Sequence, residues 1–457
     1  MKVKNKLMSG GIWAFIGKFS TSVMTLVVNV VLARFLQPSD LGVYFLAFNL
    51  ALLGAYLGTL GFEQTILKYV ADNMGKKMRA NVVYVIKFSY ISAIVGAIIL
   101  GGLYYFSSTW ISKTVFQSVG LYSISILLIF WIVANIFQIL LGETFRGFQD
   151  IRFASIFGGV LSTTIFIVSF YFGYYFEWLE INLKTVIAVW VCSLVISNLL
   201  GIFFLIKKIY SIKQGEGPLE KKSLKSKELW STAYPLLIVS VSSYILNQSD
   251  LWIIGMVRGD DDVAIYGATA KLTMIVSMPI FIVNAVVPPM IAEKFAQGKL
   301  KELEKMLRFV CTLATIPALG LVLLFAFYGG NVLSLLFGSF YSGGALMLFL
   351  LSIKHLFYVW FGVSGIVLAM TGKQKDLMRI TLTTGMLSVI LSFVLGSHFG
   401  GIGVAIGFLI SSACSQIFSW IRVRNLLNVR ADADFIGTFI QLKVFLKKRK
   451  IKKNIAS

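Results

Sequence analysis

Three lysines lie deep inside apolar stretches of the chain, at Lys18, Lys271 and Lys354. An ammonium group is costly in hydrocarbon, so such residues usually face a water-filled interior and indicate a functional site. Only one carboxylate, Asp250, lies clearly at comparable depth. The surplus of positive charge predicts an interior that attracts anions, such as phosphate, pyrophosphate or acidic sugars, because Coulomb attraction is strong at low dielectric.

Each lysine also has a simpler interpretation, in which its stem follows the helix and its ammonium reaches the headgroups. Lys18 lies about ten residues into its stretch, a depth of ~15 Å in a helix, which favours the interior. The interior is also the favoured position for Lys271 and Lys354. Lys87 is closer to a helix end, so the headgroup position is favoured there.

Two arginines and three acids complete the candidate site. Arg34 and Arg258 fall at the outer ends of their stretches and are assigned to the mouth of a cationic cavity. Asp250 is interpreted either as the partner of a cavity lysine or as a group that binds and releases a coupling H⁺ or Na⁺, because burial favours the protonated form of a carboxyl. Glu63 and Glu143, at inner helix ends, are interpreted as gate or interface groups.

Twelve long apolar segments position these charges. Each can cross a hydrocarbon core of ~30 Å, which takes ~20 helical residues. Only helices satisfy their backbone polar groups within a single segment in lipid, so the segments are predicted to be helices. The predicted spans are 9–36, 41–62, 81–106, 118–142, 153–176, 183–206, 229–257, 263–290, 305–328, 341–370, 376–397 and 400–422.

The basic residues sort to alternate ends of these spans. Of the 42 lysines and arginines, only Arg34, Lys113, Lys184 and Arg258 fall on the outer side when the N-terminus is placed in the cytoplasm. Lys18, Lys87, Lys271 and Lys354 lie within spans, and all the others flank inner ends. This bias follows the positive-inside rule and predicts that both termini are cytoplasmic.

The chain is predicted to consist of two six-helix halves. The predicted parts are an N-terminal bundle (1–208), a basic cytoplasmic linker (209–228), a C-terminal bundle (229–425) and a basic cytoplasmic tail (426–457). An aspartate followed four residues later by a tyrosine occurs at the same place in each half, at Asp40–Tyr44 and Asp262–Tyr266; these are called the first and second Asp–Tyr motifs. Matching motifs and topology indicate parallel repeats related by an axis along the membrane normal.

Composition excludes several function classes. A mean hydropathy of +0.83 is that of a membrane protein, not of a soluble domain. The net charge of +22 belongs to short loops beside apolar spans, where it sets topology and contacts anionic headgroups, so nucleic acid is not an expected partner. We find no nucleotide-binding motif, no Cys/His cluster and no extramembrane segment able to fold alone, so neither an enzyme nor a cofactor is expected.

The order of several short motifs resembles the Wzx-like polysaccharide-biosynthesis flippases, of the superfamily that includes MATE antiporters and MurJ-type lipid II flippases. The resemblance extends over essentially the whole chain. The motifs that resemble this family are Ser9–Trp13, Leu32–Leu36, Asp40–Tyr44, Arg146–Gln149, Pro235, Asp250–Gly255 and Ile265–Tyr266.

The resemblance implies a V-shaped pair of six-helix bundles around a cationic cavity. It implies that basic residues of helices one and eight face that cavity, and Lys18 and Lys271 lie on those helices. Related chains often have arginines there, so a lysine would bind the ligand with a different geometry. Twelve spans, rather than the fourteen of lipid II flippases, favour the oligosaccharide branch.

The expected function is therefore translocation of a polyprenyl-pyrophosphate-linked oligosaccharide from the inner to the outer leaflet of the plasma membrane by alternating access. Expected partners are this substrate, membrane lipids and, as further hypotheses, a coupling H⁺ or Na⁺ and the polysaccharide-assembly machinery. The rival interpretations are a cation-coupled multidrug antiporter of the same fold and a membrane-embedded sugar polymerase or ligase.

Overall fold

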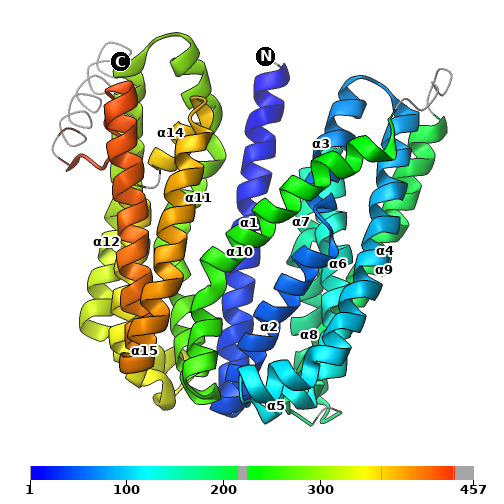
Figure 1. Cartoon of the computed structure of the whole chain (residues 1–457), viewed down its shortest axis with the longest axis vertical. Coiled ribbons are helices and arrows are strands. Elements are labelled where there is room, and N and C mark those ends of the chain that lie inside the picture. Colours follow the sequence, from blue (N-terminus) through cyan, green and yellow to red (C-terminus); the bar gives the residue numbers. More distant parts are fainter. Residues whose placement is uncertain (1, 179, 215–223, 362, 436, 438–457) are drawn as a thin grey trace, which may run out of the picture. The chain divides into compact units, whose positions relative to one another are not determined.

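The part of the chain that the computed structural model describes consists almost entirely of helices joined by short connections (Figure 1). Residues 1, 179, 215–223, 362, 436 and 438–457 lie outside the described residues, as do the side chains of 2–18, 213, 281, 282, 284–286, 289 and 292. No strand occurs among the described residues. The all-α, multi-pass character predicted from the sequence is confirmed.

Two compact units divide the chain, Met1–Ala268 and Thr269–Ser457. The helices that lie wholly in the N-terminal unit are α1 (Lys2–Phe35), α2 (Pro38–Gly58), α3 (Phe62–Gly75), α4 (Arg79–Trp110), η1 (Ile111–Val115), α5 (Val119–Ser123), α6 (Ser125–Gly147), α7 (Ile151–Ser155), η2 (Ile156–Val160), α8 (Leu161–Tyr175), α9 (Leu183–Gln214) and α10 (Ser226–Val257).

The remaining helices begin with α11 (Asp260–Ala296), which starts in the N-terminal unit and continues into the C-terminal one. The C-terminal unit also contains α12 (Leu300–Phe337), η3 (Ser339–Gly344), α13 (Ala345–Phe361), α14 (Val363–Met370) and α15 (Gln374–Leu427). The predicted division into six-helix halves after residue 208 stays a prediction about the repeats. The compact units divide later because α10 packs on α2 and α3.

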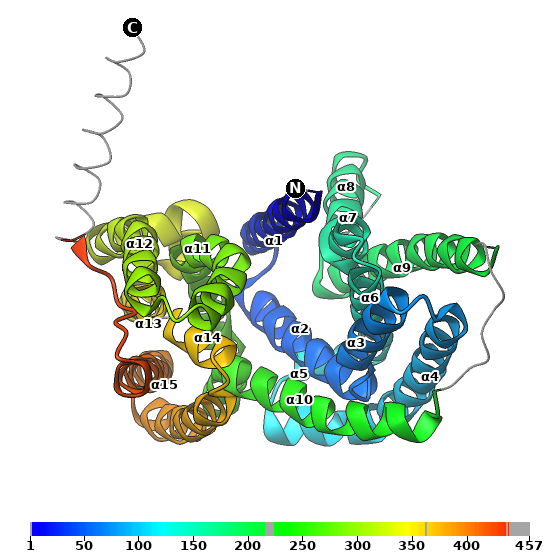
Figure 2. The same cartoon turned by 90° about the horizontal axis from the view of Figure 1, so that it is seen from above.

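The centre of the N-terminal unit is α6, which packs against α2, α3, α4 and α9. Seen end on, α6 lies between α3 and α9 (Figure 2). Its buried side chains include Trp131 and Phe145, and Gly142 lets the backbone of Gly158 in η2 approach closely. Close approach at small residues is how membrane helices gain packing energy, because lipid supplies no hydrophobic drive between them.

Two predicted single spans contain breaks. Within the span predicted at 41–62, α2 ends at Gly58, Leu60 and Gly61 have positive φ, and α3 begins at Phe62. The span predicted at 153–176 contains the π-helical turn η2, in which Gly159 has φ 147°. A glycine is required there because other residues rarely adopt that backbone conformation.

The C-terminal unit is built from α12, α13, α14 and α15, with α13 packed on both α12 and α15. Although α15 spans Gln374–Leu427, its chain direction reverses at Gly400 (φ 61°, ψ −142°). Ser392 donates a hydrogen bond from Oγ to the Val404 carbonyl, and Gly407 approaches the backbone of Ser392. These contacts are impossible in a straight helix, so α15 is a pair of antiparallel helices, visible as the orange and red limbs in Figure 1.

Ten helices among the described residues are long and apolar enough to cross a membrane, and α15 is counted once in that number. The described part of α1, Phe19–Phe35, is a shorter apolar helix. With the two limbs of α15 counted separately and α1 included, the structure is compatible with the twelve predicted spans.

Candidate functional site

The predicted cations differ in how far their side chains are buried in the structure. Lys271 in α11 and Lys354 in α13 are half-buried, and both belong to the C-terminal unit. The ammonium of Lys354 lies 5.3 Å from the centre of the Phe408 ring. Such a cation–π contact holds a lysine in a partly desolvated position without neutralising its charge.

The other three cations belong to the N-terminal unit. Arg34, near the end of α1, and Arg258, which follows α10, are both exposed. Their assignment to the mouth of a cavity stays a prediction. The backbone of Lys18 lies in α1, but its side chain falls outside the described residues.

Asp250 is buried in α10 beside a tyrosine of the second Asp–Tyr motif. The hydroxyl of Tyr266 lies 3.4 Å from Oδ2 of Asp250, and the Leu251 N–H donates to Oδ1 at 3.0 Å. Tyr266 is fully buried. From the sequence, we expected a lysine partner or a coupling ion for Asp250. The structure adds the Tyr266 hydroxyl, which was not predicted.

Glu63 is buried at the start of α3, with 1% of its surface exposed. Its carboxylate accepts two hydrogen bonds, from Thr59 Oγ1 at 2.6 Å and from Ser240 Oγ at 2.7 Å. Because Ser240 lies on α10, Glu63 connects the first helices of the chain to α10. A buried carboxylate needs such donors to offset its lost hydration.

Glu143 lies near the C-terminal end of α6 and forms an ion pair with Arg146, with Oε1 and Nη1 separated by 2.7 Å. Its second oxygen, Oε2, is buried and has no hydrogen-bond partner in the described part of the chain. The spacing of three residues between Glu143 and Arg146 places both side chains on one helix face, where such an ion pair can form.

A row of polar contacts along α10, here called the α10 seam, was not anticipated from the sequence. Besides Ser240 on Glu63, Tyr69 and Thr232 share a hydroxyl–hydroxyl bond of 3.1 Å, and Tyr244 donates to Asn49 Oδ1 at 3.1 Å. Between these contacts, any side chain at Gly61 would collide with the Ala233 carbonyl. The residues along α10 are spaced so that one face of the helix meets α2 and α3.

The two Asp–Tyr motifs pack against each other. When the motifs are aligned, Gly42 corresponds to Ala264 and Phe45 to Gly267. A Cβ on Gly42 would lie 3.2 Å from the Ala264 nitrogen, and one on Gly267 would overlap the Phe45 ring. Contacts between equivalent residues are expected where repeats meet around a local twofold axis, and they support the interpretation of the motifs as a repeat.

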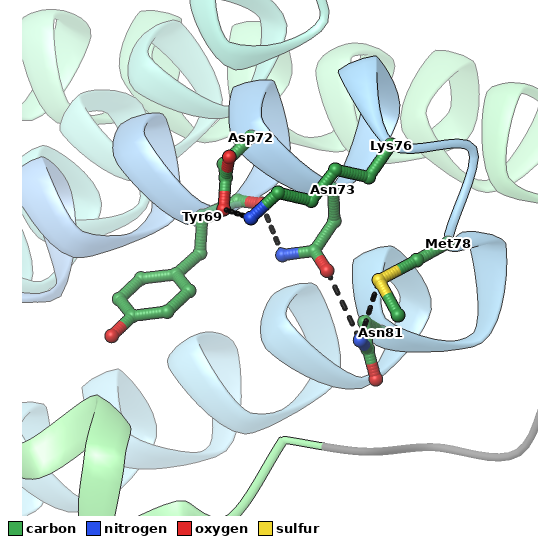
Figure 3. Close-up of polar contacts among 6 residues, drawn as sticks. All are labelled: Tyr69, Asp72, Asn73, Lys76, Met78 and Asn81. Carbon is green, nitrogen blue, oxygen red and sulfur yellow. Dashed lines mark hydrogen bonds and ion pairs between the residues drawn. The ribbon is translucent and has the colours of Figure 1, made fainter.

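The turn between α3 and α4 is held by amide side chains (Figure 3). Asn81 Nδ2 donates to Asn73 Oδ1 at 3.0 Å, and Asn73 Nδ2 donates to the Tyr69 carbonyl at 2.8 Å. The Leu224 N–H, just before α10, is 3.5 Å from Asn81 Oδ1. The turn therefore lies against the chain that enters α10, near the Tyr69 end of the α10 seam.

The described residues contain no group of three or more His, Cys, Asp or Glu able to hold a metal ion. Their polar groups can instead bind a ligand through charge and hydrogen bonds. The structure brings together Asp250 with Tyr266, and Glu63 with Ser240, while the predicted cations belong to two different compact units.

Comparisons with known proteins agree with these features. The model of the family described as polysaccharide biosynthesis protein matches residues 7–295, and that of the MatE family matches residues 235–394. An uncharacterized membrane protein of Methanocaldococcus jannaschii is 23% identical, with 96% of this chain and 87% of that protein covered.

Solved structures show the same fold. An inward-facing multidrug resistance MATE transporter of the MOP superfamily matches with a TM-score of 0.71 and 15% identity, over 89% of this chain and 94% of that one. The lipid II flippase MurJ, in an inward closed conformation, matches with a TM-score of 0.68 and 14% identity, over 90% and 87% of the two chains. Since the first family model matches well over half of a chain that also has this fold, the protein is a multi-pass membrane transporter or flippase of the polysaccharide biosynthesis protein family.

Proposed function

We propose that this protein translocates a polyprenyl-pyrophosphate-linked oligosaccharide from the inner to the outer leaflet of the plasma membrane. The observation that supports the proposal most directly is the sign of the charge within the spans. Lys271 and Lys354 are half-buried, whereas the buried carboxylates Glu63 and Asp250 accept hydrogen bonds from hydroxyl groups. Half-buried ammonium groups attract a pyrophosphate strongly because water screens them less than at the surface.

In the proposed mechanism, the pyrophosphate enters a cavity that opens alternately to each side, and lysines replace part of its hydration. Lys18, Lys271 and Lys354 supply the ammonium donors, while Arg34 and Arg258 attract the anion at the mouth. The polyprenyl tail stays in the bilayer, where moving its many methylene groups into water would be costly. Lysine presents a compact charge with rotatable donors, which suits a mobile diphosphate better than rigid bidentate binding.

Coupling to H⁺ or Na⁺ would give the transport its direction. We assign that role to Asp250, a buried carboxyl whose Oδ2 lies beside the Tyr266 hydroxyl. From the distribution of lysine and arginine, we expect both termini to lie in the cytoplasm. A transporter of such lipid-linked sugars would work beside the enzymes that assemble and polymerise them.

The test is transport of a fluorescent polyprenyl-pyrophosphate oligosaccharide in proteoliposomes, with the label on the far side detected by an impermeant quencher. Lys271→Ala and Lys354→Ala should each slow translocation by about 10- to 100-fold, the value of a charge-assisted hydrogen bond. Arginine at either position should restore part of the rate. Lys87→Ala is the matched control, because Lys87 is exposed on α4 and should leave transport unchanged.

A multidrug antiporter is the second candidate, because the MatE model matches residues 235–394 and a MATE transporter has the same fold. It predicts ion-driven efflux of an organic cation from the same proteoliposomes. Efflux of that cation without movement of the lipid-linked sugar would overturn the flippase proposal. Wild-type translocation by both lysine variants would overturn only the role assigned to the lysines.

A further inference from the structure

Buried polar atoms without partners gather where α6 packs on α9 in the N-terminal unit. Each belongs to a side chain that is at most 8% exposed. Within the described residues no hydrogen-bond partner exists for any of them. They form what we call the α6–α9 polar cluster: Trp131 Nε1 and Asn135 Nδ2 of α6, and Trp190 Nε1, Ser197 Oγ and Asn198 Oδ1 of α9.

Two direct contacts join the parts of α6 and α9 that carry these atoms. The rings of Trp131 and Trp190 are 6.3 Å apart, and Asn198 Nδ2 donates to the carbonyl of Ala134 at 2.8 Å. Asn135 is one turn beyond Trp131 on the same face of α6, and Ser197 is two turns beyond Trp190 on the same face of α9. The five atoms therefore belong to the parts of α6 and α9 that lie on either side of these two contacts.

The chemistry of the cluster defines its ligand. The two indole N–H groups and the Asn135 amide nitrogen can only donate, Asn198 Oδ1 can only accept, and the Ser197 hydroxyl can do both. No member of the set is charged. A cation would leave the three donors unsatisfied, and an anion would leave Asn198 Oδ1 unsatisfied.

We propose that the α6–α9 polar cluster is a buried binding site for water, the small neutral molecule that both donates and accepts. Leaving five buried polar atoms unpaired would cost a large part of the free energy that holds a domain folded. Buried waters commonly make about three hydrogen bonds each to such groups. A sugar is excluded as the resident ligand because none of these side chains is open to solvent in this conformation.

Radiolytic labelling of the full chain in nanodiscs tests the proposal. Short X-ray pulses produce hydroxyl radicals from water, including bound water, and mass spectrometry locates the oxidised side chains. After correction for intrinsic reactivity, Trp131 and Trp190 should be oxidised about tenfold faster than Phe145, a reference that is equally buried but has only apolar surface to offer water. Rates no higher than that of Phe145 would overturn the proposal.

A variant gives a second, independent result. Asn135→Leu has nearly the same shape but cannot bind water. If the cluster is hydrated, the variant should lower the Tm by about 2–4 °C and slow the oxidation of Trp131. A rise in Tm would show that the cluster is dry, because removing an unpaired buried donor then stabilises the fold. Protection of both tryptophans by added lipid-linked oligosaccharide would show that the site takes sugar, and would also overturn the proposal.

Discussion

At the scale of single residues, the most informative group is the buried carboxylate of Glu63. Its hydrogen bonds from Thr59 and Ser240 come from two separate parts of the chain. A carboxylate that is only 1% exposed depends on these donors, because each replaces a hydrogen bond to water. The contact between Glu63 and Ser240 therefore contributes to holding α10 on α3.

Replacing Ser240 by alanine tests this contribution. Ser240→Ala should destabilise the protein by about 1–2 kcal/mol, because Glu63 keeps only its hydrogen bond from Thr59. The measurement is thermal unfolding in detergent. Ser231→Ala on the same helix is the control, since Ser231 is exposed and bonds only to the carbonyl of Glu228 in its own helix. Equal stability of the two variants would contradict the assigned role of Ser240.

Residue types at membrane depth could be predicted from the sequence, but their partners could not. The depth of Asp250 and the spacing of Glu143 and Arg146 are local properties. The contacts of Asp250 with Tyr266 and of Glu63 with Ser240 join residues 16 and 177 positions apart. Serine and threonine give little signal in an apolar helix, because they also bond to their own backbone. Only the packing of α10 shows which hydroxyls reach a carboxylate.

At the scale of elements, the segment after α15 is more than a basic tail. Val429, Ala431 and Ala433 are buried, and the segment 428–435, here called the strap, contacts α12. The Asp434 N–H donates to Thr312 Oγ1 at 2.7 Å, and its carboxylate pairs with Arg308 at 3.1 Å. The strap thus joins the end of α15 to the N-terminal part of α12.

Removing the carboxylate should loosen the strap. Asp434→Ala breaks the ion pair with Arg308, in which both side chains are mostly buried, and should cost about 1 kcal/mol. Limited proteolysis after residue 427 should become faster in this variant. Asp72→Ala is the matched control, because its ion pair with Lys76 is largely exposed and contributes little. Unchanged proteolysis of Asp434→Ala would show that Asp434 does not hold the strap.

Helices were predictable because a long apolar run must be helical in lipid. The predicted spans at 229–257 and 263–290 correspond to α10 and α11. The break at Gly400 falls at the predicted boundary between the spans 376–397 and 400–422, whereas the break at Gly159 lies inside one predicted span, where the sequence shows only that glycines are present. The strap was missed because its alternation of small and acidic residues has no apolar run, and it is ordered by contacts with α12.

At the scale of the whole molecule, the twelve spans were predicted from hydropathy and charge, and a repeat was predicted from the two Asp–Tyr motifs and their matching topology. The boundary of the compact units was not predicted. Linker residues between α9 and α10 are the longest polar interruption in the sequence, yet the N-terminal unit continues to Ala268. The α10 seam explains the difference, because it attaches α10 to helices that precede the linker.

The predicted orientation is the property that the charge pattern determines most strongly, and it can be tested directly. Lys113 in η1 and Lys76 after α3 are both exposed and are assigned to opposite sides of the membrane. In a variant whose three cysteines are replaced by serine, Lys113→Cys should react with an impermeant maleimide in intact cells. Lys76→Cys should react only after the membrane is made permeable, because lysines and arginines beside short loops stay in the cytoplasm.

Labelling of Lys76→Cys alone in intact cells would show that the topology is the inverse of the predicted one. The pyrophosphate would then have to enter from the opposite side, so the direction of the proposed transport depends on this result.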